Sequence, residues 1–477
     1  MPSRPLLVVA GLGLLAAACN GSGGGDSRSA EESRRPPTAV APAPSTTVRT
    51  SLPPATTPSC PTLPARAEPR EDRPRYTLRV DVRTPERRVD GDLRVRFTPD
   101  LDTDRLVFRL WPNGPALAGA GARLEVGPVT VDGRELPASP EDPTTLVVRP
   151  AGGLRAGQTV DVATTWKLRL PVSSRDRVSV DGDAVRLGSF FPVLSWEPGV
   201  GWSTDPSTGG FAEDATSPTA DFDLTVAVPD GLTALASGVA DRPGHWTATA
   251  ARDVALSVGR FTLASGTARA PHPVAVTVGV AQGMGESADA YRDRVVDVLE
   301  DFARRFGPYA WDSFTLALTP GLAGAGIEYP SHVMQGSRTL GSTTSHEIGH
   351  QWFYGLVGNG QGRDPWLDEG LATWAEARYE KSLGRLRALD LPEDARGHLT
   401  EPMTYWATRR FSYYEGVYVQ GAQALAALGD PDLVDCALRV YVAQEAFGIA
   451  RPRDLVEATA AVFPDAAAVL GGFGVHG

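Results

Sequence analysis

The sequence predicts an α+β protein, in which an antiparallel β saddle or sandwich domain precedes a mainly α-helical domain. Between Tyr76 and about residue 266, apolar residues alternate with polar ones in runs separated by Pro and Gly, which is typical of half-buried strands. From Ser287 onward, apolar residues recur at intervals of three and four, which is typical of helices that pack on a core. At 477 residues, with 42% hydrophobic residues, the chain is long enough for two or three domains.

Residues 1–18 are predicted to be a signal peptide. Arg4 gives this segment a positive charge, and the apolar run from Leu6 to Ala18 is too short to span a bilayer but has the length of a signal-peptide core. The run ends in small residues directly before Cys19, as in a bacterial lipobox. We therefore expect Cys19 to be acylated and to anchor an extracytoplasmic lipoprotein to the cell membrane. The alternative is a secreted protein that is cleaved after Ala18.

Residues 19–72 are predicted to be a disordered tether between that anchor and the folded domains. The segment is rich in Gly, Ser, Pro and Thr and has few large apolar residues, so it cannot bury a core of its own. It contains Cys60, and the only cysteine beyond it is Cys436. In an exported protein these two can form a disulfide, but one pair offers no spacing pattern that distinguishes a disulfide from two separate thiols.

Residues 73–266 are assigned to the β-domain. Strands are expected at 76–82, at 93–97 and at 221–226, where apolar and polar side chains alternate. An aromatic segment with Gly and Pro, residues 189–202, interrupts this pattern. We expect it to make a hydrophobic contact between the domains, with an approach to the active site as the alternative.

Residues 267–477 are assigned to the helical domain. An apolar stripe that ends at Phe306 predicts a helix from Ser287 to Gly307-Pro308, since glycine and proline stop helices. A short strand is expected at 314–318, and further helices are expected after it.

One five-residue run, His346-Glu347-Ile348-Gly349-His350, carries the chemistry of this domain together with Glu369. Residues four apart lie on one face of a helix, so both imidazoles can reach the same metal ion. Glu369 follows His350 after eighteen residues, in a second helical pattern. Two histidines and one glutamate leave one tetrahedral position of Zn²⁺ open for water, which is the arrangement of a catalytic site. We therefore expect one zinc ion per chain, and we expect Glu347 to accept a proton from the activated water.

The alternative for this run is a surface helix that carries two histidines by chance. The chain has only seven histidines among 477 residues, so a chance match of this pattern is rare. The other five show no metal-ligand spacing and are expected to be surface or hydrogen-bonded residues; they are His245, His272, His332, His398 and His476.

The run resembles the hallmark of the aminopeptidase N family of gluzincin zinc metallopeptidases, HExxH followed after eighteen residues by Glu. The resemblance continues through Gln351-Trp352-Phe353 and through the stretch from Trp366 to Ala372. It implies a thermolysin-like catalytic domain, in which a strand, the zinc helix and the ligand helix follow one another. It also implies a short, two-domain member of the bacterial lipoprotein type, since only residues 419–477 follow Tyr418.

A second segment, Gly326-Ile327-Glu328-Tyr329-Pro330, resembles the substrate-binding strand of that family. The resemblance implies that Glu328 holds the free α-amino group of a peptide and that Gly326 belongs to the same substrate site. Ala325 and Ile327 stand where the family usually has Gly and Met, so the match is weaker here than at the zinc ligands.

A third segment, Tyr418-Val419-Gln420-Gly421-Ala422, resembles the family's Tyr-x-Lys-Gly-Ala segment, with Gln420 in place of Lys. The resemblance implies that the Tyr418 hydroxyl stabilises the tetrahedral intermediate. A phenol suits this role, because it donates a hydrogen bond to a developing oxyanion without ionising at neutral pH. Tyr413 and Tyr414 compete for the role, since Tyr414-Glu415-Gly416 partly repeats the pattern.

Together these features predict an exported zinc metallopeptidase, and an aminopeptidase that hydrolyses the amino-terminal bond of peptides. The alternatives are a zinc endopeptidase on the same fold and a peptide-binding family member without catalysis. The formal net charge of −11 and the pI near 5.2 argue against nucleic acid as a partner. The expected partners are peptide or protein substrates and the membrane that holds the lipid anchor, and the chain is expected to be a monomer.

Overall fold

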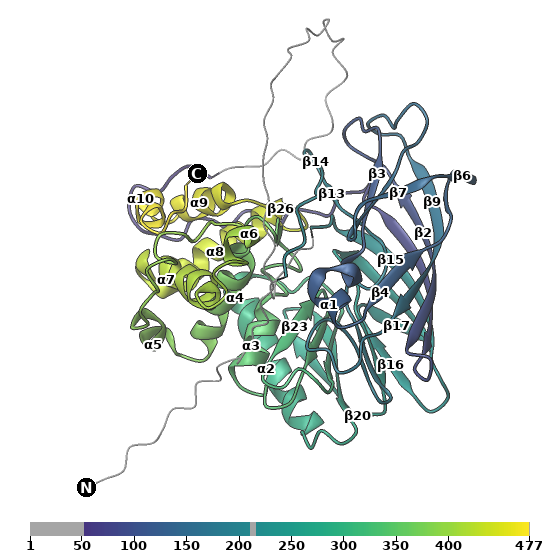
Figure 1. Ribbon diagram of the computed structural model, residues 1–477. Helices are drawn as coiled ribbons and strands as arrows, with labels where there is room; N and C mark the ends of the chain where they lie inside the picture. Colours follow the sequence, from purple (N-terminus) through teal and green to yellow (C-terminus); the bar gives the residue numbers. More distant parts are fainter. Residues whose placement is uncertain (1–51, 210–215, 477) are drawn as a thin grey trace, which may run out of the picture. The chain divides into compact units, whose positions relative to one another are not determined.

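The computed structural model describes residues 52–209 and 216–476. The predicted signal peptide, Cys19 and the first part of the predicted tether lie outside the described residues. Within the described ranges, no helix combines the length and the apolar character that a membrane span requires. Figure 1 labels the helices and strands along the chain.

The β-rich region, residues 73–259, contains a nine-stranded sheet with the order β17-β18-β15-β1-β2-β9-β5-β6, to which β4 is added beside β9. Alternate residues of β1 are buried, as the alternating pattern predicts. The strands of this sheet are β1 (Arg75–Arg83), β2 (Arg88–Phe97), β4 (Arg123–Val126), β5 (Val129–Val131), β6 (Arg134–Leu136), β9 (Val160–Arg169), β15 (Ala220–Ala227), β17 (Val239–Arg242) and β18 (His245–Ala251).

One strand pair in this sheet differs from the expected antiparallel arrangement. β1 and β15 run parallel, with Tyr76 opposite Phe222, and these two rings stack with their centroids 4.7 Å apart. The alternation of apolar and polar residues is the same in parallel and antiparallel strands, so the sequence pattern does not reveal the direction of a strand. The remaining pairs of this sheet are antiparallel.

Two smaller sheets complete the β-rich region, with the orders β12-β3-β8-β7 and β10-β11-β19-β16. Their strands are β3 (Leu106–Arg109), β7 (Ala138–Asp142), β8 (Thr145–Val148), β10 (Val178–Asp181), β11 (Ala184–Leu187), β12 (Val193–Leu194), β16 (Thr233–Ala236) and β19 (Leu256–Gly259). The hairpin β13 (Trp196–Glu197) and β14 (Gly201–Trp202), the short helix α1 (Pro115–Gly119) and the single turn at Trp111–Asn113 lie in the connections.

The aromatic segment at 189–202 belongs mainly to the core of the β-rich region. Phe190 and Phe191 are fully buried there, and Trp196 packs edge-on against Phe97. The segment also reaches the helical region, where the Glu197 carboxylate pairs with Arg363 at 2.6 Å and Ser189 Oγ lies 3.3 Å from the Tyr329 hydroxyl.

The helical region, residues 260–476, begins with a five-stranded sheet in the order β20-β21-β22-β24-β23. β23 is its edge strand and pairs with β24 alone. The strands are β20 (Phe261–Arg269), β21 (Pro273–Ala281), β22 (Ser313–Leu318), β23 (Gly326–Tyr329) and β24 (His332–Gln335). The expected domain boundary at 266/267 therefore falls inside β20, because a strand at a domain junction has the same alternating pattern as the strands before it.

The helix α2 (Ala288–Phe306) covers this sheet and follows the predicted stripe. The Ser287 side chain caps it by accepting from the Ala290 N–H, and Gly307, with φ of 103°, ends it. The helices that follow are α3 (Ser342–Gly349), α4 (Trp366–Tyr379), α5 (Leu383–Arg387), α6 (Met403–Trp406), the π-helical segment η2 (Tyr414–Val419), α7 (Gln420–Ala427), α8 (Pro431–Glu445), α9 (Pro452–Ala460) and α10 (Ala466–Gly471). The short strands β25 (Gly358–Asn359) and β26 (Ile449–Ala450) pair in parallel.

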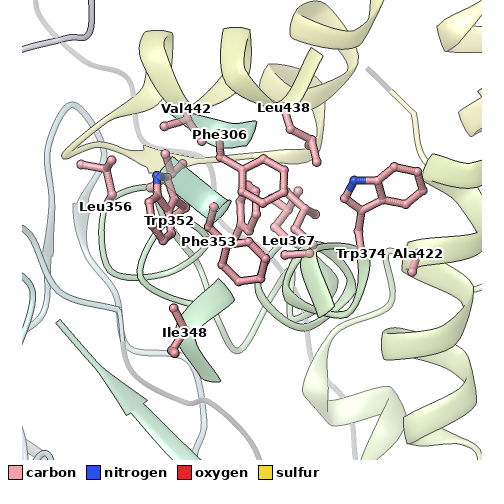
Figure 2. Close-up of a cluster of buried hydrophobic side chains, with 14 of the residues drawn as sticks. Phe306, Ile348, Trp352, Phe353, Leu356, Leu367, Trp374, Ala422, Leu438 and Val442 are labelled. Atoms are coloured by element: carbon pink, nitrogen blue, oxygen red, sulfur yellow. The ribbon is translucent and has the colours of Figure 1, made fainter. Parts of the chain in front are cut away.

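The core of the helical region holds the helices that carry the predicted metal ligands. Figure 2 shows Ile348 of α3, Trp352 and Phe353 of the following turn, and Trp374 of α4 in one buried cluster. Each of these four side chains is at most 1% exposed. Dense packing of this kind resists displacement, so it fixes α3 and α4 relative to each other.

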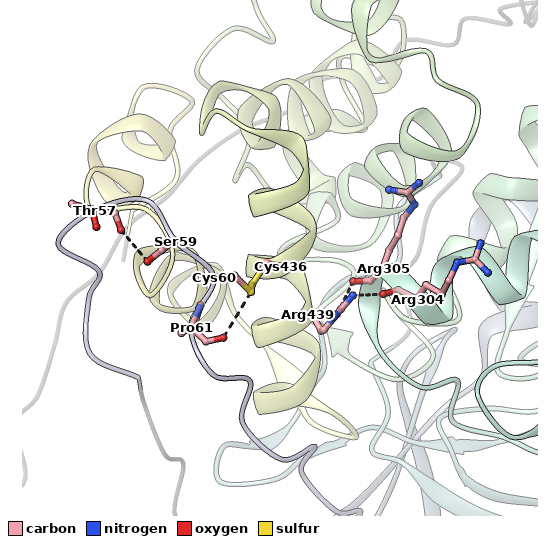
Figure 3. The surroundings of a disulfide bond; sticks show 8 residues. All are labelled: Thr57, Ser59, Cys60, Pro61, Arg304, Arg305, Cys436 and Arg439. Atoms are coloured by element: carbon pink, nitrogen blue, oxygen red, sulfur yellow. Dashed lines mark hydrogen bonds between the residues drawn. A yellow bond between two sulfur atoms is a disulfide. The ribbon is translucent and has the colours of Figure 1, made fainter.

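The part of the predicted tether that the structure describes, residues 52–72, is not free chain. Ala55 and Ser59 donate backbone hydrogen bonds to Ala460 and Val462, and Ala67 donates to Ala443 at 2.8 Å. Figure 3 shows that Cys60 is bonded to Cys436 of α8, and that Arg439 of the same helix donates to the carbonyls of Arg304 and Arg305. The prediction of disorder is wrong for this part, because composition reports the missing apolar side chains but not hydrogen bonds and a disulfide to a distant helix.

Candidate active site

The three predicted metal ligands converge where α3 meets the first turn of α4. His346 Nε2 lies 3.1 Å from Glu369 Oε2, His350 Nε2 lies 3.2 Å from His346 Nε2, and His350 Nε2 lies 3.4 Å from Glu369 Oε2. Zinc bonds of about 2.0–2.1 Å in a tetrahedron place the ligand atoms roughly 3.3–3.4 Å apart. The three atoms therefore form one face of a tetrahedron of the size that Zn²⁺ requires.

A close approach of the two helices makes this convergence possible. A Cβ on Gly349 would lie 3.2 Å from the Cα of Ala372, so a larger residue at 349 would push α4 away from α3. Gly349, which lies between the two histidines, is therefore required by the close approach of α3 and α4.

Each ligand imidazole is oriented by a carboxylate on its other nitrogen. His350 Nδ1 lies 2.5 Å from Asp368 Oδ1, and Asp368 Oδ2 accepts from Gln361 Nε2 at 2.7 Å. His346 Nδ1 lies 3.3 Å from Glu376 Oε2. Such carboxylate–histidine pairs direct the remaining nitrogen to the metal and raise its basicity.

These orienting residues were missed by the sequence reasoning, although two signals were available. Asp368 directly precedes the ligand Glu369, and Glu376 follows Glu369 by two helical turns, on the same face of α4. Gln361 lies in a loop and offers no periodic signal of this kind.

The charges at the ligands are strongly coupled through the buried site. Burial alone would lower the pKa of His346, but its hydrogen bonds to Glu369 and Glu376 raise it to about 10. Burial alone would raise the pKa of Glu369, but the two histidines hold it well below its usual range. The site therefore keeps an ionised carboxylate in the interior, which favours the binding of a cation.

Glu347 lies beside the ligands with one oxygen to spare. The residue is 6% exposed, and its Oε2 has no hydrogen-bond partner among the described residues. Burial raises the pKa of Glu347 to about 7. A Cβ on Gly326 would lie 2.5 Å from Glu347 Cδ, so Gly326 provides the space that this carboxylate occupies.

Tyr418 is brought to the metal ligands by a crossing of α4 with the segment that leads into α7. Its hydroxyl donates to Glu369 Oε1 at 2.6 Å, and its ring stacks on that of His346 at a centroid distance of 5.7 Å. Gly370 and Gly421 face each other at the crossing, where a Cβ on Gly421 would lie 2.7 Å from the Cα of Gly370.

The two competing tyrosines pack against the ring of Tyr418. Tyr414 is 55% exposed, and its ring lies 5.0 Å from that of Tyr418. Tyr413 is buried beside Tyr418, at a centroid distance of 5.7 Å. Gln420, where the family usually has Lys, is buried and donates to the carbonyls of Ala395 and Gly416, so it stabilises the loop packing instead of reaching the metal site.

Glu328 lies in the edge strand β23 and reaches the same site. The residue is 7% exposed, and its carboxylate, His350 and Asp368 have atoms within 4.8 Å of one another. Burial raises the pKa of Glu328 to about 8, while His350 acts to lower it. Because His350 Nδ1 is already bonded to Asp368, this trio is a carboxylate beside the metal site and not a second metal site.

The described residues contain no other group of His, Cys, Asp and Glu that lies close enough to hold a metal ion. The buried histidines outside the site have other partners. His332 Nε2 lies 3.0 Å from Ser257 Oγ, and His245 Nδ1 lies 2.5 Å from Asp241 Oδ1.

Comparisons with known proteins give partial sequence matches and broader structural matches. No family model matches the chain. Human aminopeptidase B is 32% identical over 106 residues, which cover 20% of this chain and 16% of that protein. Human aminopeptidase RNPEPL1 is 28% identical over 200 residues, 34% of this chain and 26% of that protein. Leukotriene A-4 hydrolase of Xenopus laevis is 35% identical over 104 residues, 20% of this chain and 16% of that protein.

The matched part of the chain spans about a sixth to a quarter of the length of these curated relatives. Among solved structures, the M1 zinc metallopeptidase from Deinococcus radiodurans has a TM-score of 0.61 and 20% identity, and the match covers 85% of this chain and 94% of that one. A two-domain M1 zinc metallopeptidase bound to L-arginine matches with the same TM-score, identity and coverage. At this identity the structural likeness establishes a shared two-domain fold.

Proposed function

We propose that this chain belongs to the aminopeptidase N type of gluzincin zinc metallopeptidases. On this premise, it is a zinc-dependent aminopeptidase that releases the first residue of peptides. The observation that carries the proposal is the placement of a buried carboxylate, Glu328, beside the zinc ligands and Glu347. An enzyme that acts at the amino terminus needs such a fixed anion near the metal, because the substrate brings an α-ammonium group. The order of β22, β23, α3 and α4 supports the finer description of this region as thermolysin-like.

His346, His350 and Glu369 would hold the zinc ion, whose chemistry is to polarise the scissile carbonyl and to make a coordinated water acidic. Glu347 is the base. Its Oε2 has no other partner among the described residues, so it is available to accept the proton of the attacking water and to return it to the leaving amine.

Tyr418 is the donor for the developing oxyanion. The hydrogen bond to Glu369 holds the phenol beside the ligand set, and the ring contact with His346 restricts its motion. A phenol has a single proton, which points to Glu369 in this structure, so the hydroxyl turns to the oxyanion as that charge forms, while the ring stays in place.

Glu328 would pair with the α-ammonium group of the substrate. Burial, and after it the charges of Asp368, Glu347 and Glu369, raise the pKa of Glu328, so this carboxyl ionises fully only when a cation such as the α-ammonium group lies beside it. A cation placed there is stabilised by several carboxylates at once, and its charge-assisted hydrogen bond to Glu328 is stronger in a desolvated site. Cleavage would then be confined to the first peptide bond.

A zinc endopeptidase is the second candidate, because β23 is an edge strand on which an internal stretch of a long chain could also align. A family member that only binds peptides is disfavoured, since the base, the three ligands and the tyrosine are all in place.

The location of the protein is a separate proposal. We propose that Cys19 carries a lipid and anchors a monomeric enzyme outside the cytoplasm, with simple secretion as the alternative. The disulfide between Cys60 and Cys436 supports an oxidising compartment. Lipid labelling of the wild type and its loss in Cys19→Ala would support the anchor, whereas an unlipidated protein in the medium would favour secretion.

Product mapping tests the proposed activity. The purified, zinc-loaded chain is incubated with an unblocked peptide of about ten residues, and the products are followed by mass spectrometry. We expect a ladder of peptides that lose residues one at a time from the amino end. Internal fragments as the first products would instead assign an endopeptidase.

A further inference from the structure

Two charged residues follow each other in the loop between β18 and β19. Arg252 and Asp253 are each 3% exposed. Burial of a charge costs several kcal/mol unless hydrogen bonds compensate for the lost water. The two side chains bond to separate groups: Arg252 donates to backbone carbonyls, and Asp253 accepts from a hydroxyl and from a backbone N–H. The two charges thus hold two different sets of contacts.

The guanidinium of Arg252 holds the turn that follows the zinc helix α3. Its Nε donates to the Tyr354 carbonyl at 2.8 Å, and its Nη2 donates to the Leu356 carbonyl at 3.4 Å. The other acceptors are the carbonyls of Ser217, at 3.1 Å, and Gly448. One side chain of the β-rich region therefore joins the turn to β26 and its surroundings.

This turn contacts the ring of the ligand His350, whose Nδ1 is also oriented by Asp368. The Phe353 carbonyl lies 3.2 Å from His350 Nδ1, and the His350 carbonyl accepts from the Gly355 N–H at 2.8 Å. Between them, Tyr354 has φ of 124°, a conformation that L residues rarely adopt. A strained turn persists only when its surroundings hold it, and Arg252 supplies two of the hydrogen bonds that do so.

Asp253 reaches the other half of the site through two hydroxyl groups. Its Oδ2 accepts from Ser189 Oγ at 2.7 Å, and Ser189 Oγ lies 3.3 Å from the Tyr329 hydroxyl. Because the single proton of Ser189 points to Asp253, the Tyr329 hydroxyl donates to Ser189. A Cβ on Gly188 would lie 2.2 Å from this hydroxyl, so the chain leaves room for it there.

Tyr329 and Glu328 are neighbours in β23, and successive side chains of a strand point to opposite faces. When Tyr329 is fixed toward the β-rich region, Glu328 is fixed toward the zinc ligands. β23 is paired on one side only, so contacts of its side chains contribute more to its position than they would in a central strand.

We propose that Arg252 and Asp253 are positioning residues of the active site, in which Arg252 fixes the turn that orients His350 and Asp253, through Ser189 and Tyr329, fixes the strand that carries Glu328. One loop of the β-rich region thereby sets the distance between the metal and the substrate anchor. The part that concerns Asp253 rests on the proposed function, since it takes Glu328 as the anchor of the α-amino group.

The Arg252→Lys variant tests the first half. The ammonium group of Lys lacks the planar, forked donors with which a guanidinium donates hydrogen bonds to several carbonyls at once. We expect zinc affinity, measured by competition with a chelator, to fall about tenfold, as for other residues that orient metal ligands. This readout does not depend on peptidase activity. The matched control is Arg109→Lys, at another buried arginine, which donates to Thr144 Oγ1 and to the Asp205 carbonyl. This variant should keep the zinc affinity of the wild type.

The Asp253→Asn and Tyr329→Phe variants test the second half. Asp253→Asn leaves one acceptor oxygen for two donors, Ser189 Oγ and the Val254 N–H, and Tyr329→Phe removes the hydroxyl that contacts Ser189. Each weakens the connection to β23, so each should raise KM for unblocked peptides about two- to tenfold while kcat and zinc affinity stay within about twofold. The double variant should show no more than the larger single effect, since both substitutions break the same chain. If Asp253→Asn does not fold, Tyr329→Phe decides alone.

A different pattern would overturn the proposal. If Arg252→Lys and Arg109→Lys retain zinc equally well, Arg252 has no positioning role. If Tyr329→Phe leaves KM unchanged, or lowers zinc affinity as much as Arg252→Lys, then Asp253 and Ser189 do not fix β23 independently of the zinc ligands. A wild type that binds zinc but cleaves no peptide would refute the proposed function. The comparison of zinc affinities would still test the role of Arg252.

Discussion

The two halves of the active site are built in different ways. The metal half, with His346, His350 and Glu369, sits on two helices that pack against each other within the helical region. The anchoring half, with Glu328, sits on an edge strand that contacts the β-rich region through Tyr329. The arrangement of the metal half therefore follows from helical spacing, which is local, whereas the position of the proposed anchoring half depends on loops that are distant in sequence.

The largest expected effect is on the chemical step and lies in the metal half. Glu347→Gln removes the base but keeps the shape of the side chain, so kcat should fall by about 10²- to 10⁴-fold. Zinc content, measured by elemental analysis, should stay at one ion per chain. Full turnover in this variant would mean that another group is the base.

Tyr418→Phe should have the next largest effect. Loss of one donor to the oxyanion lowers kcat by about 10²- to 10³-fold in comparable sites. Tyr414→Phe is the matched control, because Tyr414 is exposed, whereas the Tyr418 hydroxyl donates to the ligand Glu369. The Tyr414→Phe variant should retain near wild-type kcat. Steady-state kinetics of both variants decide between the two tyrosines, and a reversed ranking would assign the role to Tyr414.

Glu328→Ala should break the anchoring half alone. Loss of a charge-assisted contact of about 1.5–3 kcal/mol corresponds to roughly a ten- to hundredfold loss of kcat/KM for unblocked peptides, carried chiefly by KM. Zinc affinity should be unchanged, because Glu328 is not a ligand. Equal losses of kcat/KM for unblocked and amino-acetylated peptides would show that Glu328 does not bind the amino group.

The smallest effect on activity is expected from the disulfide, which lies outside both halves. Replacement of Cys60 and Cys436 by Ser together removes a link between residues 376 apart in sequence, and should cost about 2–4 kcal/mol of unfolding free energy. Thermal unfolding with and without the bond measures this loss. The value of kcat/KM should change by no more than about twofold; a larger change would mean that the segment 52–72 acts on the site.

The metal half follows directly from the spacing of residues in the sequence. The family prediction, the zinc metallopeptidase class and the single zinc ion agree with the similarity to M1 zinc metallopeptidases and aminopeptidases. The position of Glu328 and Tyr418 beside the ligands came from resemblance, since nothing in their own spacing brings a residue 49 positions beyond Glu369 back to it. The Gly370–Gly421 crossing that does so is visible only in three dimensions.

The features that sequence reasoning missed share a physical cause. The parallel pairing of β1 with β15 and the ordered segment 52–72 both depend on partners that are far away in the chain. In the sequence, Arg252 and Asp253 are indistinguishable from charged residues of an exposed loop. The carbonyls and hydroxyls that bond to them in the structure have no recognisable sequence pattern. Local periodicity predicts elements, whereas contacts between elements decide how the anchor meets the metal.

The central claim is that a zinc site and an amino-group anchor act on the same substrate. It is tested most directly by the ratio of kcat/KM for one peptide with a free amino terminus and for the same peptide acetylated, measured on the zinc-loaded chain. The account predicts that the free peptide is cleaved at its first bond and that acetylation lowers kcat/KM by about tenfold or more, since the charge-assisted contact to Glu328 is lost. Equal values for the two peptides, with cleavage at internal bonds, would contradict it.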